Sequence, residues 1–163
     1  MRALIVYASW FGHNRTIARL IAAELAERDV IADCIPISKV SAHDLAEYDL
    51  LVLGTYTHLG RASGRMRAFC EAIPLRLLDR VTVALFGTQV VQDQPHLGGT
   101  SGVDDLESRL LSRGCELALA PLRIELPADR ALLSSKELGP ADLRVVKEFA
   151  ADLWEVSVAA PLI

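Results

Sequence analysis

Short runs that are apolar throughout alternate along the chain with longer segments whose apolar residues recur every three or four positions. Runs of the first kind occupy residues 2–9, 50–56 and 80–88. An apolar run without polar alternation is typical of a strand that is buried on both faces. Residues 30–38 alternate and predict another strand, and residues 115–125 predict a fifth strand that is interrupted at Pro121.

The segments between these runs have the periodicity of amphipathic helices. Helices are predicted over residues 14–29, 63–73, 103–114 and 139–156, and residues 41–49 form a polar connection with at most one helical turn. Asn14 is the expected N-cap of the first helix, Gly114 the stop of the third, and Pro140 an early residue of the last.

Strands that alternate with helices predict an α/β fold in which helices cover both faces of a parallel sheet. We expect one domain over residues 1–163. Ligands of such folds bind beyond the carboxyl ends of the strands, where the strand order reverses. The candidate site therefore lies in the loops 9–14, 55–64 and 88–100.

The first of these loops reads SWFGHN and has the layout of an anion site. Gly12 permits a tight turn, and the helix that follows presents free N–H groups and a favourable dipole. Ser9 and Asn14 could donate hydrogen bonds to phosphate oxygens. An ordinary turn between strand and helix explains the loop equally well. The chain has neither the GxxxxGK[ST] nor the GxGxxG pattern of nucleotide loops.

The other two loops carry polar and flat side chains. Tyr56 and His58 could stack on a planar ring or bond to its edge, and glycines at positions 54, 60 and 64 would let the backbone approach it closely. Loop 88–100 shows no metal-ligand spacing, and either loop could be a plain solvated surface. Its polar candidates are Thr88, Gln89, Gln92, Asp93, Gln94 and His96, and Val90 and Val91 could flank an apolar ligand.

Charge and composition limit the kinds of partner that the protein is expected to bind. A formal net charge of −4 argues against nucleic acid, which needs a basic face. No apolar run reaches the roughly 20 residues of a membrane span, and no signal-peptide pattern opens the chain, so we expect a cytoplasmic protein. Cys34, Cys70 and Cys115 show no pairing pattern and are expected to act as small buried apolar residues.

Taken together, the three loops resemble those of the flavodoxins, and the resemblance covers nearly the whole chain. SWFGHN keeps Ser9 and Gly12 of the flavodoxin loop S/T-x-T-G-x-T, while Phe11 and Asn14 occupy the two later threonine positions. LVLGTYTHLG is similar to the segment in which a strand ends in glycine and the next loop wraps the flavin ring. VTVALFGTQ, followed by LESRLLSRGCEL, is similar to the flavodoxin FG strand end and the helix after its loop.

This resemblance implies a three-layer sandwich with a five-stranded parallel sheet in the order 2-1-3-4-5, and FMN bound without a covalent bond. The phosphate would be held by Ser9, Gly12, His13 and Asn14, with Trp10 and Phe11 covering the phosphate or ribityl region. One face of the isoalloxazine would be lined by Thr55, Tyr56, Thr57, His58 and Gly60. Its other side and pyrimidine edge would be approached by Gly87, Thr88 and Gln89.

The first functional reading is an FMN protein that carries electrons to or from a redox partner protein. A second is an FMN-dependent oxidoreductase acting on a small quinone-like acceptor or on protoporphyrinogen. VLGTYTHLGRASGRMRAF is similar to a segment of the menaquinone-dependent protoporphyrinogen dehydrogenases, but their long insertion near the third loop is not evident here.

A third reading is an interaction module that has lost FMN, because two threonine positions of the phosphate loop are changed. No tyrosine in loop 88–100 is placed to stack on the flavin, and His96 is the only candidate there. The apolar tail SVAAPLI either packs on the domain or joins a homodimer contact.

Overall fold

A single parallel sheet runs through the protein, whose computed structural model describes residues 1–90, 101–128 and 137–160. Within that part of the chain, five strands lie in the order β2-β1-β3-β4-β5, and every neighbouring pair is parallel. The predicted α/β class and the strand order implied by the resemblance are therefore confirmed. The strands are β1 (Arg2–Tyr7), β2 (Ile31–Pro36), β3 (Leu50–Tyr56), β4 (Thr82–Val90) and β5 (Leu122–Leu126).

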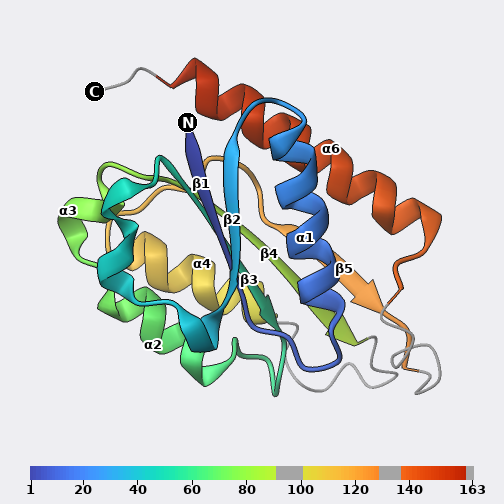
Figure 1. Cartoon of the computed structure of the whole chain (residues 1–163). Coiled ribbons are helices and arrows are strands. Elements are labelled where there is room, and N and C mark those ends of the chain that lie inside the picture. Colours follow the sequence, from blue (N-terminus) through green and yellow to red (C-terminus); the bar gives the residue numbers. More distant parts are fainter. Residues whose placement is uncertain (91–100, 129–136, 161–163) are drawn as a thin grey trace.

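Helices α1 (His13–Ala26) and α6 (Pro140–Ala159) cover one face of this sheet (Figure 1). Their apolar side chains, such as Ile17 and Phe149, pack in one core cluster with Ile5, Val52 and Phe86 of the strands. Because successive strand residues point to opposite faces, these side chains belong to alternate positions of each strand.

The opposite face is covered by α2 (Gly64–Ala72) and α4 (Gly102–Ser112), with the shorter elements η1 (Ile37–Lys39), η2 (Ala42–Glu47) and α3 (Leu75–Leu78) beside them. Met66 and Leu106 pack there against Leu4, Leu53 and Leu85 in a second core cluster. Both faces of the inner strands are thus buried, which is why their sequences lack polar alternation.

The boundaries of several elements differ from the sequence predictions. Asn14 was expected to cap the first helix, but that N-cap is Gly12 in a left-handed conformation (φ 93°), and Asn14 lies inside the first turn. The fifth strand begins only at Leu122, and before Pro121 it is represented by a bridge between Leu117 and Val83. Proline lacks the N–H that a ladder needs, so the pairing restarts after it.

The predictions for the burial of the cysteines and for the end of the last helix also differ from the structure. Cys70 and Cys115 are buried as expected, but Cys34 is only partly buried on the edge strand β2. The predicted tail begins as helix, since α6 continues through Ala159. No helix in the described ranges is long and apolar enough to cross a membrane. Val91 and the polar candidates Gln92, Asp93, Gln94 and His96 lie outside the described residues.

Candidate functional site at the carboxyl edge of the sheet

The loop between β1 and α1 folds back on itself around Ser9. The Gly12 backbone N–H donates to the Ser9 Oγ at 2.9 Å, so the hydroxyl accepts within the loop and keeps its own proton free to donate. Gly12 adopts a positive φ that a side chain would disfavour, and this turn starts α1 directly at His13. The amino terminus of a 14-residue helix therefore faces the end of the sheet.

His13 and Asn14 are buried polar side chains in this first turn, with exposed fractions of 3% and 1%. Asn14 donates through Nδ2 to the Ala8 carbonyl at 2.9 Å. The His13 Nδ1 and the Asn14 Oδ1 have no hydrogen-bond partner among the described residues. Burial lowers the pKa of His13, since its charged form is desolvated. Orphaned buried polar atoms are costly, so this pair indicates a place for a polar ligand.

The loop also carries an exposed aromatic pair that reaches toward β3. The Trp10 ring lies edge-on to Tyr56 at 5.5 Å between centroids and tilted over His58 at 5.2 Å. Phe11 stacks on Trp10 with 6.2 Å between the ring centroids. Trp10 therefore bridges the loop of β1 and the loop of β3. It keeps 59% of its surface exposed, which leaves a flat ring accessible.

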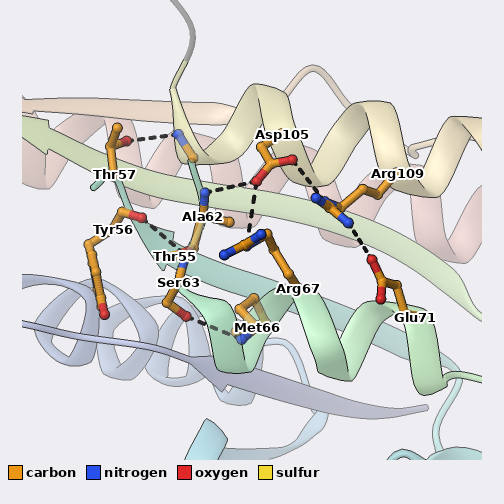
Figure 2. A network of polar contacts seen from close by, with 11 residues as sticks. Thr55, Tyr56, Thr57, Ala62, Ser63, Met66, Arg67, Glu71, Asp105 and Arg109 are labelled. Carbon is orange, nitrogen blue, oxygen red and sulfur yellow. Dashed lines mark hydrogen bonds and ion pairs between the residues drawn. The ribbon is translucent and has the colours of Figure 1, made fainter. Parts of the chain in front are cut away.

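The loop after β3 is fixed at its base by polar contacts (Figure 2). Thr55 is fully buried, and its Oγ1 accepts from the Ser63 N–H at 3.1 Å. Thr57 donates its N–H to the Thr88 carbonyl and accepts from the Gly102 N–H through Oγ1, both at 2.9 Å. Thr55 therefore supports the loop from below, while Tyr56 and Thr57 reach the site.

The end of β4 completes the candidate site at the carboxyl ends of the strands. Gly87 allows close packing, because a Cβ there would lie 2.1 Å from Val103 Cγ2 and 2.7 Å from the Thr55 carbonyl oxygen. Thr88 is buried at the strand end, and Gln89 Nε2 donates to Glu125 Oε1 at 3.4 Å. Gly87 is thus a packing residue of the strand, whereas Thr88 and Gln89 face the hollow beside it.

These elements enclose a small hollow of mixed polar and apolar lining between α1 and the ends of β3 and β4. Nine of the predicted residues line it, whereas Gly12, Thr55, His58, Gly60 and Gly87 shape the surrounding loops and strands without lining it. The lining set comprises Ser9, Trp10, Phe11, His13, Asn14, Tyr56, Thr57, Thr88 and Gln89. Val90 and Leu126 also line the hollow. Leu126 was missed by sequence reasoning, because it reads as an ordinary strand residue.

The sequence of this chain is similar to those of known flavodoxins. A family model described as "Flavodoxin domain" matches residues 4–110. A curated relative, "Probable flavodoxin 1" of Bacillus subtilis (strain 168), is 41% identical over 88 residues. That match covers 53% of this chain and 56% of the relative, so it spans only about half of either protein.

Solved structures extend the likeness over most of the chain. Oxidised flavodoxin 2 from Bacillus cereus superimposes with a TM-score of 0.71 at 26% identity, covering 95% of this chain and 99% of that one. Oxidised flavodoxin 1 from the same species gives a TM-score of 0.72 at 23% identity, covering 95% and 98%. At such identity the second structure supports the fold alone.

Proposed function

Because the chain belongs to the flavodoxin family, we propose that it binds one FMN without a covalent bond and carries electrons to or from a redox partner. Bound FMN supplies the redox chemistry, and the protein's residues hold and shield it. The observation that carries the proposal is the buried pair of unpartnered atoms, His13 Nδ1 and Asn14 Oδ1, in the first turn of α1.

These two residues suit different parts of FMN. The His13 imidazole, once protonated, can donate to a phosphate oxygen beside the helix amino terminus, with Ser9 Oγ and the turn at Gly12 nearby. Asn14 already uses Nδ2 on Ala8, and its free Oδ1 is an acceptor. An acceptor suits a ribityl hydroxyl better than a phosphate oxygen, so we assign Asn14 to the ribityl chain.

The flat part of the cofactor would meet the remaining lining residues. Tyr56 and Thr57 come from the loop after β3, in which His58 lies against Trp10 outside the hollow, and Thr88 and Gln89 come from the end of β4. Trp10 supports a ring contact as well, because it already packs on Tyr56 and His58 and stays exposed. In this proposal Trp10 supplies an aromatic surface for which loop 88–100 offered only His96.

The electron-carrier reading is favoured over the two alternatives. An interaction module without cofactor has no use for buried unpartnered polar atoms, which cost stability when nothing binds them. The enzyme reading, with a quinone or protoporphyrinogen as substrate, rests on one segment of resemblance and on no feature of the described site. All three cysteines are free thiols, which is consistent with a protein that functions in the reducing cytoplasm.

The first experiment is to mix the purified apoprotein with FMN and record the visible spectrum and the stoichiometry. We expect one FMN per chain, a resolved flavin band, and reversible reduction that needs an external electron source. Turnover of quinones with NAD(P)H and no reductase would favour the enzyme, and absence of any FMN binding would contradict the proposal.

The assignment of the two buried residues is tested by comparing FMN with riboflavin, which lacks the phosphate. A hydrogen bond to a charged group contributes about 1.5–3 kcal/mol, so His13→Gln should weaken FMN about tenfold or more and leave riboflavin nearly unchanged. Asn14→Ala should weaken both ligands. The control is His43→Ala, on the exposed surface of η2. Equal FMN affinity in the Asn14 and His43 variants would refute the assignment.

A further inference from the structure

The loop after β3 ends in a strained turn. His58 and Arg61 exchange two backbone hydrogen bonds of 2.9 and 3.0 Å, and the two residues between them, Leu59 and Gly60, have φ angles of 49° and 74°. A turn with two positive φ values favours Asn-Gly, and a leucine in that conformation is disfavoured. Leu59 is 75% exposed, so burial does not offset the strain. Such strain persists only where the surroundings enforce it.

Hydrogen bonds of the threonines at the end of β3 fix the residues before this turn. Asp105 of α4 fixes the residue that follows it. Asp105 Oδ2 accepts from the Ala62 N–H at 3.1 Å, immediately after Arg61. The contact crosses 43 residues of sequence and joins the loop to the first turn of α4, as Figure 2 shows. Gly102, on the same turn, donates to Thr57. The helix that follows loop 88–100 thus fixes both ends of the loop of β3.

Asp105 is itself fixed by arginines. Its Oδ1 accepts from Arg109 Nε at 2.8 Å, and Arg109 also bonds to Glu71 of α2. Arg67 Nε lies 4.0 Å from Oδ2 and has no hydrogen-bond partner within the described ranges. A carboxylate held by two cations is a stronger acceptor and a more rigid one than a neutral amide. These ion pairs therefore fix the carboxylate that accepts from the Ala62 N–H.

We propose that Asp105 is a positioning residue for the flavin site, which holds the strained turn at Leu59 and thereby sets the position of Tyr56, Thr57 and His58 against the ring. The inference rests on the proposed function, because it assigns these loop residues to FMN. Asp105 acts through the loop and contacts no ligand.

The test compares Asp105→Asn with Glu107→Gln, an equal charge change on the same helix at a residue that pairs with Arg123 instead of the loop. The first readout is hydrogen exchange of the Ala62 amide, which needs no flavin. We expect exchange in Asp105→Asn to be at least about tenfold faster, because the charge-assisted bond is lost. FMN and riboflavin should both bind about tenfold more weakly, and the midpoint potential and visible circular dichroism of bound flavin should change. Glu107→Gln should match the wild type.

A rescue variant separates positioning from general destabilisation. Leu59→Asn creates the Asn-Gly turn that adopts positive φ readily, so the loop no longer depends on Asp105. Added to Asp105→Asn, it should restore most of the flavin affinity and the midpoint potential. If Asp105→Asn does not fold, Leu59→Asn alone should raise the urea midpoint of the wild type, and a lowered or unchanged midpoint would overturn the strain argument.

Failure of the inference and failure of the proposed function give different results. Wild-type protein that binds no flavin refutes the function, while the Ala62 exchange still decides whether Asp105 holds the loop. Flavin binding with unchanged affinity and potential in Asp105→Asn overturns the positioning role and leaves the function intact. The positioning role would also be overturned if Asp105→Asn lost flavin affinity and the added Leu59→Asn did not restore it.

Discussion

At His13, burial favours the neutral imidazole, whereas the proposed binding of a phosphate favours the charged one. His13 is 3% exposed at the start of α1, and burial lowers the pKa of its imidazole from the ordinary value. A neutral buried histidine is adequate for the free protein, whereas a phosphate dianion favours the protonated form. FMN binding should therefore reverse the direction of the pKa shift.

The pH dependence of apoprotein stability follows from this shift. The unfolded chain takes up a proton at His13 near the ordinary histidine pKa of about 6.5, whereas the folded protein does so only at lower pH. Stability is therefore lost as the pH falls through about 6.5 toward the lowered folded pKa. Urea unfolding at pH 7.5 and 5.5 should show a smaller loss in His13→Gln than in wild type. His43→Gln is the exposed control, and equal losses in wild type and His13→Gln would contradict the prediction.

At the scale of elements, glycines set how closely the strands and helices of the site approach. Gly54 of β3 faces the Phe86 ring, where a Cβ would lie 2.0 Å from Cζ. Gly87 of β4 lies against α4, and its Cβ would meet both Val103 and the backbone of β3. Sequence analysis assigned Gly87 to the flavin edge, and the structure adds that it is needed for packing. The apolar run of β4 gives no sign of this.

Gly87→Ala should destabilise the apoprotein by about 1–3 kcal/mol, the usual cost of overpacking, because the Thr55 carbonyl cannot yield without moving β3. The matched control is Gly64→Ala at the start of α2. Its added Cβ would find only Arg67 Nη2 at 3.8 Å, so the change should be neutral or slightly stabilising. Urea unfolding of both variants measures the difference. Equal stability would show that the Gly87 contact relaxes freely.

On the scale of the whole molecule, charge is distributed unevenly despite the net value of −4. Arg15, Arg61 and Arg65 are exposed near the carboxyl ends of β1 and β3, and in the part of the chain that is described none of them forms an ion pair. Burial raises the pKa of the Cys34 thiol, while the charges of Arg19 and Arg15 act in the opposite direction, which locates these arginines beside β2. The rim on that side of the site is basic.

A basic rim should steer anionic electron acceptors toward the site. We expect ferricyanide to oxidise the reduced protein more slowly as salt rises, and hexaamminecobalt(III) to show the opposite trend. Arg61→Gln with Arg65→Gln should slow the ferricyanide reaction about two- to tenfold at low salt. The control pair is Arg76→Gln with Arg80→Gln at the opposite edge of the sheet. Stopped-flow rates that respond equally to both pairs would contradict local steering.

The sequence by itself determined the fold class, the loops 9–14 and 55–64, and most side chains that line the hollow. Burial on both faces leaves continuous apolar runs, and parallel strands bring their carboxyl ends to one edge. Only the tertiary structure decided that Trp10 packs on Tyr56 and His58, that Asn14 lies inside the helix rather than at its cap, and that Asp105 holds Ala62. Each of these features depends on local backbone geometry or on how two loops or elements meet, and a one-dimensional pattern of polar and apolar residues encodes neither.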